Sequence, residues 1–218
     1  MKYLKFIKRE AINWLLILLP FIYILLVYDR LPRFAPFQAD SEQRIYHLLL
    51  FTMGFCILMY IVLLVKPSIV PKTAFHDNLK SLHRIRTLMV VFLSFLSLTY
   101  ISQGIGIPFN WSKTGFIIAM VFMTVFGNLY PTIRYNYIIG IKNPWTQSNE
   151  HIWKKTHRFA GKVFFFGGLI GALYGMLFNV NPVPYMPVIW VGYTFTLLFI
   201  PNLYSYLLYR QFQSYNQG

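Results

Sequence analysis

The chain alternates between long apolar runs and shorter polar connections. Six apolar runs can be marked, at residues 11–28, 46–65, 87–107, 115–130, 162–179 and 188–209. A helix needs about 20 residues to cross a hydrocarbon core about 30 Å thick, and the six runs lie near that length. Backbone groups in lipid have no water to bond, so each run is expected to be an α-helix. The pattern predicts an all-α integral membrane protein with a bundle of six transmembrane helices.

The start of the first run and the end of the third each fit two interpretations. The first follows basic residues, as a signal peptide would, but it is long and aromatic and leads into Asp29-Arg-Leu-Pro rather than a small-residue cleavage site. It is therefore expected to be retained as the first span. The third loses its strongly apolar character near Ile101, and Gln103, Gly104 and Gly106 fit either a helix end or a loop.

Composition agrees with a membrane protein. Charged residues make up 12% of the 218 positions and the mean hydropathy is +0.50, whereas soluble domains carry about 25% charged residues. The net charge of +14 does not predict nucleic-acid binding, because the charges sit in short segments between apolar runs and no recognition motif accompanies them.

The basic residues are distributed unevenly between alternate connections. Sixteen of the 20 Lys and Arg residues fall in the N-terminus, the second and fourth connections and the C-terminus, and four fall on the other side. By the positive-inside rule, both termini are cytoplasmic, and the protein is expected in a bacterial cytoplasmic membrane.

The fourth connection is the longest polar stretch of the chain. Residues 127–161 hold five Lys and Arg residues against one acid, Glu150. We expect an N-terminal membrane half at residues 1–113 and a C-terminal half at 114–218, with a cytoplasmic motif loop at 131–161.

Local signals predict the elements of this loop. Pro131 ends or kinks the fourth span, and Asn143-Pro144 signals a turn. Thr146 or Ser148 is then a good N-cap for a further helix. In its first turn Glu150 is favoured by the helix dipole and reaches Lys154 four residues on. One face of that helix carries apolar and small residues, so it could lie at the membrane interface before the fifth span: Ile152, Trp153, Thr156, Phe159 and Ala160.

Two polar residues recur at a similar expected depth. Asn128 and Asn202 each begin an Asn-Leu-Tyr triplet near the cytoplasmic end of a span. An amide at that depth needs a hydrogen-bond partner.

The fifth span carries glycines at four-residue spacing, Gly167, Gly171 and Gly175. Such spacing lets another helix approach the backbone closely. We predict that this helix packs inside the monomer, with a homodimer seam as the alternative.

Residues that carry enzyme chemistry are sparse. The single cysteine, Cys56, allows neither an intrachain disulfide nor a thiolate cluster. The pairs His76 with His83 and His151 with His157 have no HExxH motif or acidic cluster beside them. No acid lies deep in a span, which lowers the case for coupled transport. No enzymatic activity, metal or cofactor is predicted.

The polar stretch resembles the SdpI family of bacterial membrane immunity proteins. The resemblance is carried by Gly127-Asn128-Leu129, Pro131, Asn136-Tyr137, Ile139-Gly140-Ile141-Lys142, Pro144-Trp145-Thr146, Ser148-Asn149-Glu150, Trp153-Lys154, Thr156-His157-Arg158 and Gly161-Lys162. It extends over about residues 116–210. The first outer loop departs from the family pattern, since only Leu31-Pro32 and Pro36 remain of it.

This resemblance implies a six-helix protein that protects against a secreted, membrane-active peptide toxin. It also implies that such a protein can signal the toxin's presence by recruiting a transcriptional repressor to the membrane. The expected partners are therefore the lipid bilayer, a peptide toxin and a cytoplasmic repressor, without direct nucleic-acid binding. The candidate motif and partner-binding residues are Asn128, Asn136, Tyr137, Gly140, Pro144, Trp145, Thr146, Asn149, Glu150, Trp153, His157 and Arg158. Two alternatives remain open: a transporter or exporter without intramembrane charge coupling, and a membrane enzyme with a site at the cytoplasmic face.

Overall fold

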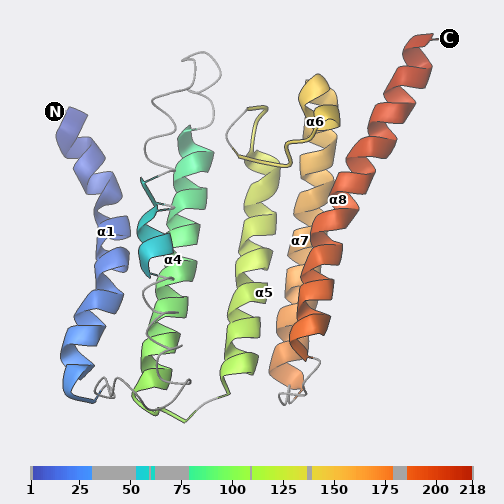
Figure 1. The fold of residues 1–218 in the computed structure, drawn as a ribbon. Helices are drawn as coiled ribbons and strands as arrows, with labels where there is room; N and C mark the ends of the chain where they lie inside the picture. Colours follow the sequence, from blue (N-terminus) through green and yellow to red (C-terminus); the bar gives the residue numbers. More distant parts are fainter. Residues whose placement is uncertain are drawn as a thin grey trace. The chain divides into compact units, whose positions relative to one another are not determined.

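The structure is a computed structural model that describes residues 2–30, 53–58, 60–61, 79–108, 110–136, 139–178 and 186–217. Its elements are the α-helices α1 (Lys2–Val27), α4 (Leu79–Gly104), α5 (Trp111–Leu129), α6 (Pro144–Ser148), α7 (Glu150–Leu177) and α8 (Met186–Gln217). Two 3-10 turns, η1 (Tyr28–Arg30) and η4 (Tyr130–Thr132), follow α1 and α5 (Figure 1). Within these ranges every regular element is a helix and no strand occurs, as predicted.

Five helices in the described ranges are long and apolar enough to cross a membrane. The qualifying segments are Glu10–Val27, Ser81–Gln103, Lys113–Thr132, Glu150–Leu177 and Val188–Tyr215. Many large apolar side chains on them are exposed, among them Leu25, Leu177 and Val188, each more than 70% exposed. Contiguous apolar surface of this kind is suited to lipid. The chain is a multi-pass membrane protein.

The predicted number of six spans stays a prediction. The expected second span, residues 46–65, lies largely outside the described residues, although 53–58 and 60–61 are helical. The cytoplasmic position of both termini is likewise untested by the fold.

The chain divides into two compact units. The first comprises Met1–Val65 and Arg86–Gly115, and the second Lys66–Ile85 and Phe116–Gly218. The start of α4, residues 79–85, thus belongs to the second unit, and the start of α5, residues 111–115, belongs to the first. The predicted halves 1–113 and 114–218 remain a prediction.

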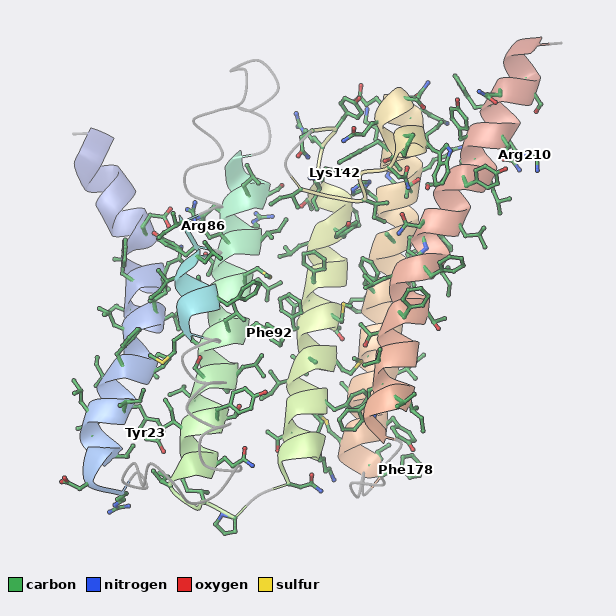
Figure 2. All side chains as sticks on the ribbon, in the orientation of Figure 1. Tyr23, Arg86, Phe92, Lys142, Phe178 and Arg210 are labelled. Atoms are coloured by element: carbon green, nitrogen blue, oxygen red, sulfur yellow. The ribbon has the colours of Figure 1, made fainter. Side chains whose placement is uncertain are left out.

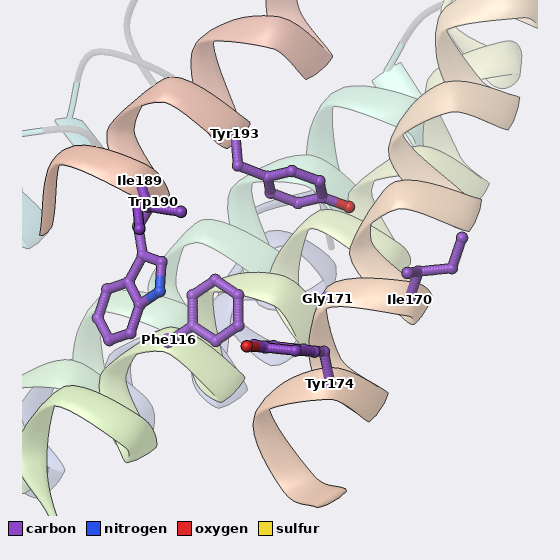
Figure 3. Close-up of a pocket in the computed structure, with 7 residues that line it drawn as sticks. All are labelled: Phe116, Ile170, Gly171, Tyr174, Ile189, Trp190 and Tyr193. Atoms are coloured by element: carbon purple, nitrogen blue, oxygen red, sulfur yellow. The ribbon is translucent and has the colours of Figure 1, made fainter. Parts of the chain in front are cut away.

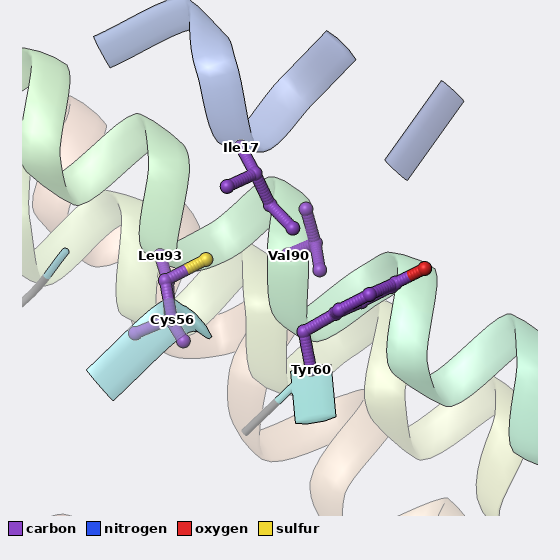
Figure 4. Packing of buried hydrophobic residues seen from close by; sticks show 5 residues of the cluster. All are labelled: Ile17, Cys56, Tyr60, Val90 and Leu93. Carbon is purple, nitrogen blue, oxygen red and sulfur yellow. The ribbon is translucent and has the colours of Figure 1, made fainter. Parts of the chain in front are cut away.

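The first unit has an apolar core between α1, the helical residues 53–58 and 60–61, and α4. Ile17, Cys56, Tyr60, Val90 and Leu93 form one buried cluster (Figure 4). Ser94 Oγ donates to the Leu16 carbonyl at 2.8 Å, and so adds a polar contact between α1 and α4.

A buried charged cluster lies beside this apolar core. Glu10 is completely buried and forms an ion pair with Arg86, which is 5% exposed (Figure 2). The other Glu10 carboxylate oxygen accepts from Asn13 Nδ2 at 2.8 Å and from the Tyr60 hydroxyl at 3.3 Å. The Arg86 guanidinium also lies over the Tyr60 ring, 5.5 Å from its centroid.

The third apolar run was expected to begin at residue 87, which left Arg86 in the second connection, so this cluster was not predicted. Arg86 lies within α4, which begins at Leu79 rather than near residue 87. Glu10 does mark the start of the first span, as expected, but its charge is balanced by Arg86 within the protein.

In the second unit, α5, α7 and α8 run side by side, with α7 antiparallel to the other two (Figure 1). Close approach of α5 and α7 depends on small residues. A Cβ placed on Gly168 would lie 2.6 Å from the Thr124 backbone nitrogen and 2.7 Å from the Met120 carbonyl oxygen. A Cβ on Gly161 would lie 2.8 Å from the Gly127 carbonyl oxygen. The backbones of α5 and α7 therefore touch along much of their length.

The three glycines singled out in the sequence face both neighbours of α7. A Cβ on Gly167 would meet Leu197 of α8 at 2.5 Å, and one on Gly175 would meet Ile117 of α5 at 2.8 Å. Gly171 faces both helices, with Met120 Sδ at 2.6 Å and Tyr193 Cε1 at 3.5 Å. These positions are filled by contacts within one chain.

Candidate functional site

The motif segment, defined here as residues 131–161, folds back onto the end of the helix bundle. It comprises the end of η4, an irregular connection at 133–143, helix α6 and the first turns of α7. Tyr137 and Ile138 lie outside the described residues, so the candidate Tyr137 cannot be placed.

Trp153 and His157 of α7 form the centre of the segment. Both are buried, and their rings stack with centroids 4.0 Å apart. Tyr130 stacks on the other side of His157 at 5.0 Å, and Trp153 Nε1 donates to the Ile133 carbonyl at 3.1 Å. Three aromatic rings thus connect η4 to the first turns of α7.

Both ring nitrogens of His157 are used inside the protein. Nε2 accepts from the backbone N–H of Ile141 at 3.2 Å, and Nδ1 lies 2.9 Å from the Trp153 carbonyl oxygen. Since Nε2 accepts, Nδ1 carries the proton and donates, which assigns the neutral tautomer. His157 therefore orients the connection, and the arrangement gives it no free nitrogen for a metal or a substrate.

Gly140 lies directly against these rings. Its φ of +132° is one that L side chains rarely adopt. A Cβ there would overlap His157 Nε2 and would come within 2.8 Å of Trp153 Cη2. Only glycine lets the chain pass over this stack.

Asn136 shapes the preceding turn. It is buried; its Nδ2 donates to the Arg134 carbonyl at 2.6 Å and its Oδ1 accepts from the Ile139 N–H at 2.9 Å. Tyr135 donates its hydroxyl to the Gln147 carbonyl at 2.6 Å. These bonds fold the connection against α6.

Asn143 caps the short helix α6, which was not predicted. Thr146 or Ser148 was expected to cap the helix that carries Glu150, but that helix, α7, has Asn149 as its N-cap. Asn143 Oδ1 accepts from the Thr146 N–H at 2.9 Å, and Thr146 Oγ1 accepts from the Asn143 N–H at 3.2 Å. This reciprocal pair is a capping box, with Pro144 at the first helical position. The Asn-Pro-x-Thr spacing is typical of such a capping box, but the Asn-Pro pair was interpreted as a turn signal alone.

Asn143 also joins the segment to α8. Its Nδ2 donates to Ser205 Oγ at 2.9 Å and to Asn202 Oδ1 at 3.1 Å. Asn202 thus has the partner that its depth requires, whereas the side chain of Asn128 is exposed on α5. The two Asn-Leu-Tyr triplets are therefore not equivalent in structure. Neither Asn143 nor Ser205 was among the residues predicted for the site. A serine in a largely apolar run was the available signal for Ser205.

The helix after α6 is the membrane helix itself. α7 begins at Glu150, with Asn149 as its N-cap accepting from the His151 N–H at 2.7 Å, and continues without a break to Leu177. The expected separate interfacial helix is therefore wrong. Gly161, the one weak helix former near the expected turn, packs against Pro131 and the Gly127 carbonyl, which offsets its low helix propensity.

The remaining candidates face outward. Pro144, Glu150 and Arg158 are exposed, and Trp145 is half-buried with its ring 5.1 Å from that of Tyr206. Glu150 makes the expected pair with Lys154 at 2.8 Å. The candidate set therefore splits into buried residues that hold the segment together and outward residues that a partner could contact.

A separate apolar cavity lies farther along α7. Its volume is about 290 Å³, and it is lined by Phe116, Ile170, Gly171, Tyr174, Ile189, Trp190 and Tyr193 (Figure 3). Phe116 stacks on Trp190 at 4.6 Å, and the Tyr193 hydroxyl donates to the Gly167 carbonyl at 2.7 Å. This lining is mainly apolar and aromatic.

Metal-ligating side chains are dispersed. Across the part of the chain that the structure describes, no three His, Cys, Asp or Glu side chains lie close enough to hold a metal ion. The partner of the first predicted pair, His76, lies outside that part.

Most of the motif segment matches the model of a known protein family. The model of the SdpI/YfhL protein family matches residues 132–205, from the end of η4 to Ser205 of α8. The family resemblance is confirmed. The matched segment includes Asn136, Gly140, Thr146, Trp153 and His157, whose contacts build the site.

A curated relative extends the similarity beyond this segment. The chain is 24% identical over 215 residues to "Immunity protein SdpI" of Bacillus subtilis (strain 168), covering 94% of this chain and 97% of the relative. The similarity to an SdpI protein thus includes the N-terminal half, although the motif-based resemblance was clear only after residue 116. No solved structure matches the chain significantly.

Proposed function

We propose that this protein gives immunity to a secreted, membrane-active peptide toxin, or signals the presence of such a toxin, in a bacterial cytoplasmic membrane. The observation that carries the proposal is the similarity to an immunity protein along 94% of the chain. The family match over the motif segment supports it. The role is one of binding, without catalysis.

The contacts of the motif segment support a scaffold that presents a surface. Its polar and aromatic interior is occupied by internal bonds, such as those of His157 and Thr146. Recognition is then assigned to the outward residues Trp145, Glu150 and Arg158. In the predicted orientation these face the cytoplasm, where a repressor could be recruited, while toxin contact falls to the outer loops and lipid-facing helices.

Expression in toxin-sensitive bacteria tests the immunity proposal. Cells carrying this chain, the Bacillus subtilis relative or an empty vector are exposed to a panel of secreted membrane-active peptides. We expect this chain to raise survival against at least one of them. Unchanged killing by every peptide, with the protein present in the membrane, would reject immunity.

The signalling part has its own test. Arg158→Ala changes an outward side chain, so we expect it to keep wild-type thermal stability, whereas Trp145→Ala also loses the ring contact with Tyr206 and should cost about 1 kcal/mol. If a repressor docks on this surface, its toxin-dependent membrane association should fall in these variants while immunity persists. Retained association in both variants would remove the docking role of these residues.

A further inference from the structure

A small cavity lies between the first turns of α7 and the last turns of α8. Its volume is about 180 Å³, and its lining comes from His151, Ile152 and Lys155 of α7 and from Leu208, Gln211 and Phe212 of α8. Ile152 is 1% exposed, whereas His151, Lys155 and Gln211 are exposed. The cavity therefore combines an apolar wall with a cationic and polar rim.

Its rim belongs to a basic stripe along α7. His151, Lys155, Arg158 and Lys162 are all exposed and follow one another at spacings that place them on one helix face. The same face continues with the exposed apolar residues Phe166 and Leu173. A face that changes from basic to apolar along one helix is typical of the boundary between lipid headgroups and hydrocarbon.

Helix length gives the same depth for the cavity. About 20 residues cross the hydrocarbon core, and this length counted back from Leu177 in α7 ends at Arg158. Counted forward from Val188 in the antiparallel α8, it ends at Leu207. His151, Lys155, Leu208 and Gln211 lie just beyond these points, so both helices place the cavity at headgroup level.

We propose that this cavity binds the headgroup of an anionic phospholipid. Lys155 and His151 donate to the phosphate, Gln211 donates to a polar group of the headgroup, and Ile152, Leu208 and Phe212 contact the glycerol and the upper acyl chain. Basic pockets between transmembrane helices are suited to anionic headgroups because charge and apolar contact coincide there. The proposal is independent of toxin immunity.

Two neighbouring lysines allow a matched test. Lys155→Gln removes a charge from the cavity rim, and Lys154→Gln removes the same charge from the adjacent residue, which pairs with Glu150 instead. Both side chains are exposed, so thermal stability should match the wild type in each variant. Purified full-length protein in detergent is titrated with phosphatidylglycerol or with phosphatidylcholine of the same acyl chains, and bound lipid is counted by native mass spectrometry.

We expect the wild type and Lys154→Gln to prefer phosphatidylglycerol, and Lys155→Gln to bind it about fivefold more weakly, as expected for one lysine near a headgroup. Equal loss in both variants would indicate unspecific surface charge and overturn the proposal. Unchanged phosphatidylglycerol binding by Lys155→Gln would also overturn the proposal. The basic rim would then be better explained as a site for an acidic protein segment. A third arm adds inorganic phosphate: displacement of the lipid at millimolar concentration would identify a free-phosphate site instead.

Discussion

Gly140 illustrates how a single position holds the motif segment in place. The chain passes over the Trp153 and His157 rings at this residue, with a positive φ and no space for a side chain. His157 in turn accepts from the N–H of the next residue, Ile141. A change at Gly140 therefore disturbs the backbone, the ring stack and this hydrogen bond together.

We expect Gly140→Ala to lower the free energy of unfolding by about 1–3 kcal/mol, from backbone strain and overpacking. Gly115→Ala is the control, since a Cβ at Gly115 meets nothing within 4 Å. Unfolding in mixed micelles measures both variants. Equal stabilities would contradict the packing described for Gly140.

Asn143 combines two roles that substitution can separate. Serine retains an N-cap oxygen but is too short to reach α8, and alanine loses both contacts. We expect Asn143→Ser to cost about 1 kcal/mol for the lost bonds to Asn202 and Ser205. Asn143→Ala should cost about 1 kcal/mol more for the lost cap. A serine variant as stable as the wild type would show that the contact with α8 contributes nothing.

The two carboxylates of the described helices should differ strongly in their effect. Removing the buried charge in Glu10→Gln leaves Arg86 buried without its counter-charge, so we expect a loss of about 3–5 kcal/mol. Glu150→Ala removes an exposed pair and a helix-dipole contact, for which about 0.5 kcal/mol is expected. Similar melting temperatures for the two variants would contradict the burial of the Glu10–Arg86 pair.

Of the described elements, α7 makes the most packing contacts, because its small residues let its neighbours approach closely. Gly161 and Gly168 bring its backbone against α5, while Gly167 meets α8. The four-residue glycine pattern predicted a packed helix from sequence. It did not predict that Gly161 and Gly168, which are seven residues apart, face α5, because close approach depends on which face each neighbour occupies.

Two glycine-to-alanine substitutions separate the effect of a close helix–helix contact from the effect of helix propensity. Gly168→Ala places a Cβ against the backbone of α5, which cannot move like a side chain, so we expect a loss of about 1–3 kcal/mol. Gly192→Ala in α8 meets nothing within 4 Å, and its better helix propensity should stabilise by up to about 1 kcal/mol. Thermal midpoints in detergent compare them. A Gly168→Ala variant at least as stable as the wild type would mean that α5 and α7 do not touch at Gly168.

Apolar periodicity and turn signals predicted the helices, the break at Pro131 and the Glu150–Lys154 pair, because these depend on neighbours along the chain. The continuous start of α7 was not predicted, since Gly161 is held helical by Pro131 and Gly127 from another element. The Glu10–Arg86 pair was missed for a similar reason: its members are 76 positions apart, and a basic residue near a span reads as a loop charge. The links from Asn143 to α8 also join distant positions.

Across the described residues, the long helices expose apolar side chains, and the buried side chains of the motif segment mostly contact one another. Such a molecule provides an apolar surface suited to lipid and an outward polar face that a partner could contact. The similarity to an immunity protein along nearly the whole chain gives this binding its proposed purpose. Immunity then requires the intact bundle rather than one reactive residue.

The toxin dose that kills half of a sensitive population tests this account most directly. It is measured in cells that express the wild type, the destabilised Gly140→Ala variant or no protein, with the amount of membrane-inserted protein determined for each strain. We expect a higher half-killing dose for the wild-type strain than for the empty strain. Protection by Gly140→Ala should be reduced in proportion to its folded fraction. The same killing dose in the wild-type and empty strains, at normal membrane levels and for every peptide tested, would contradict it.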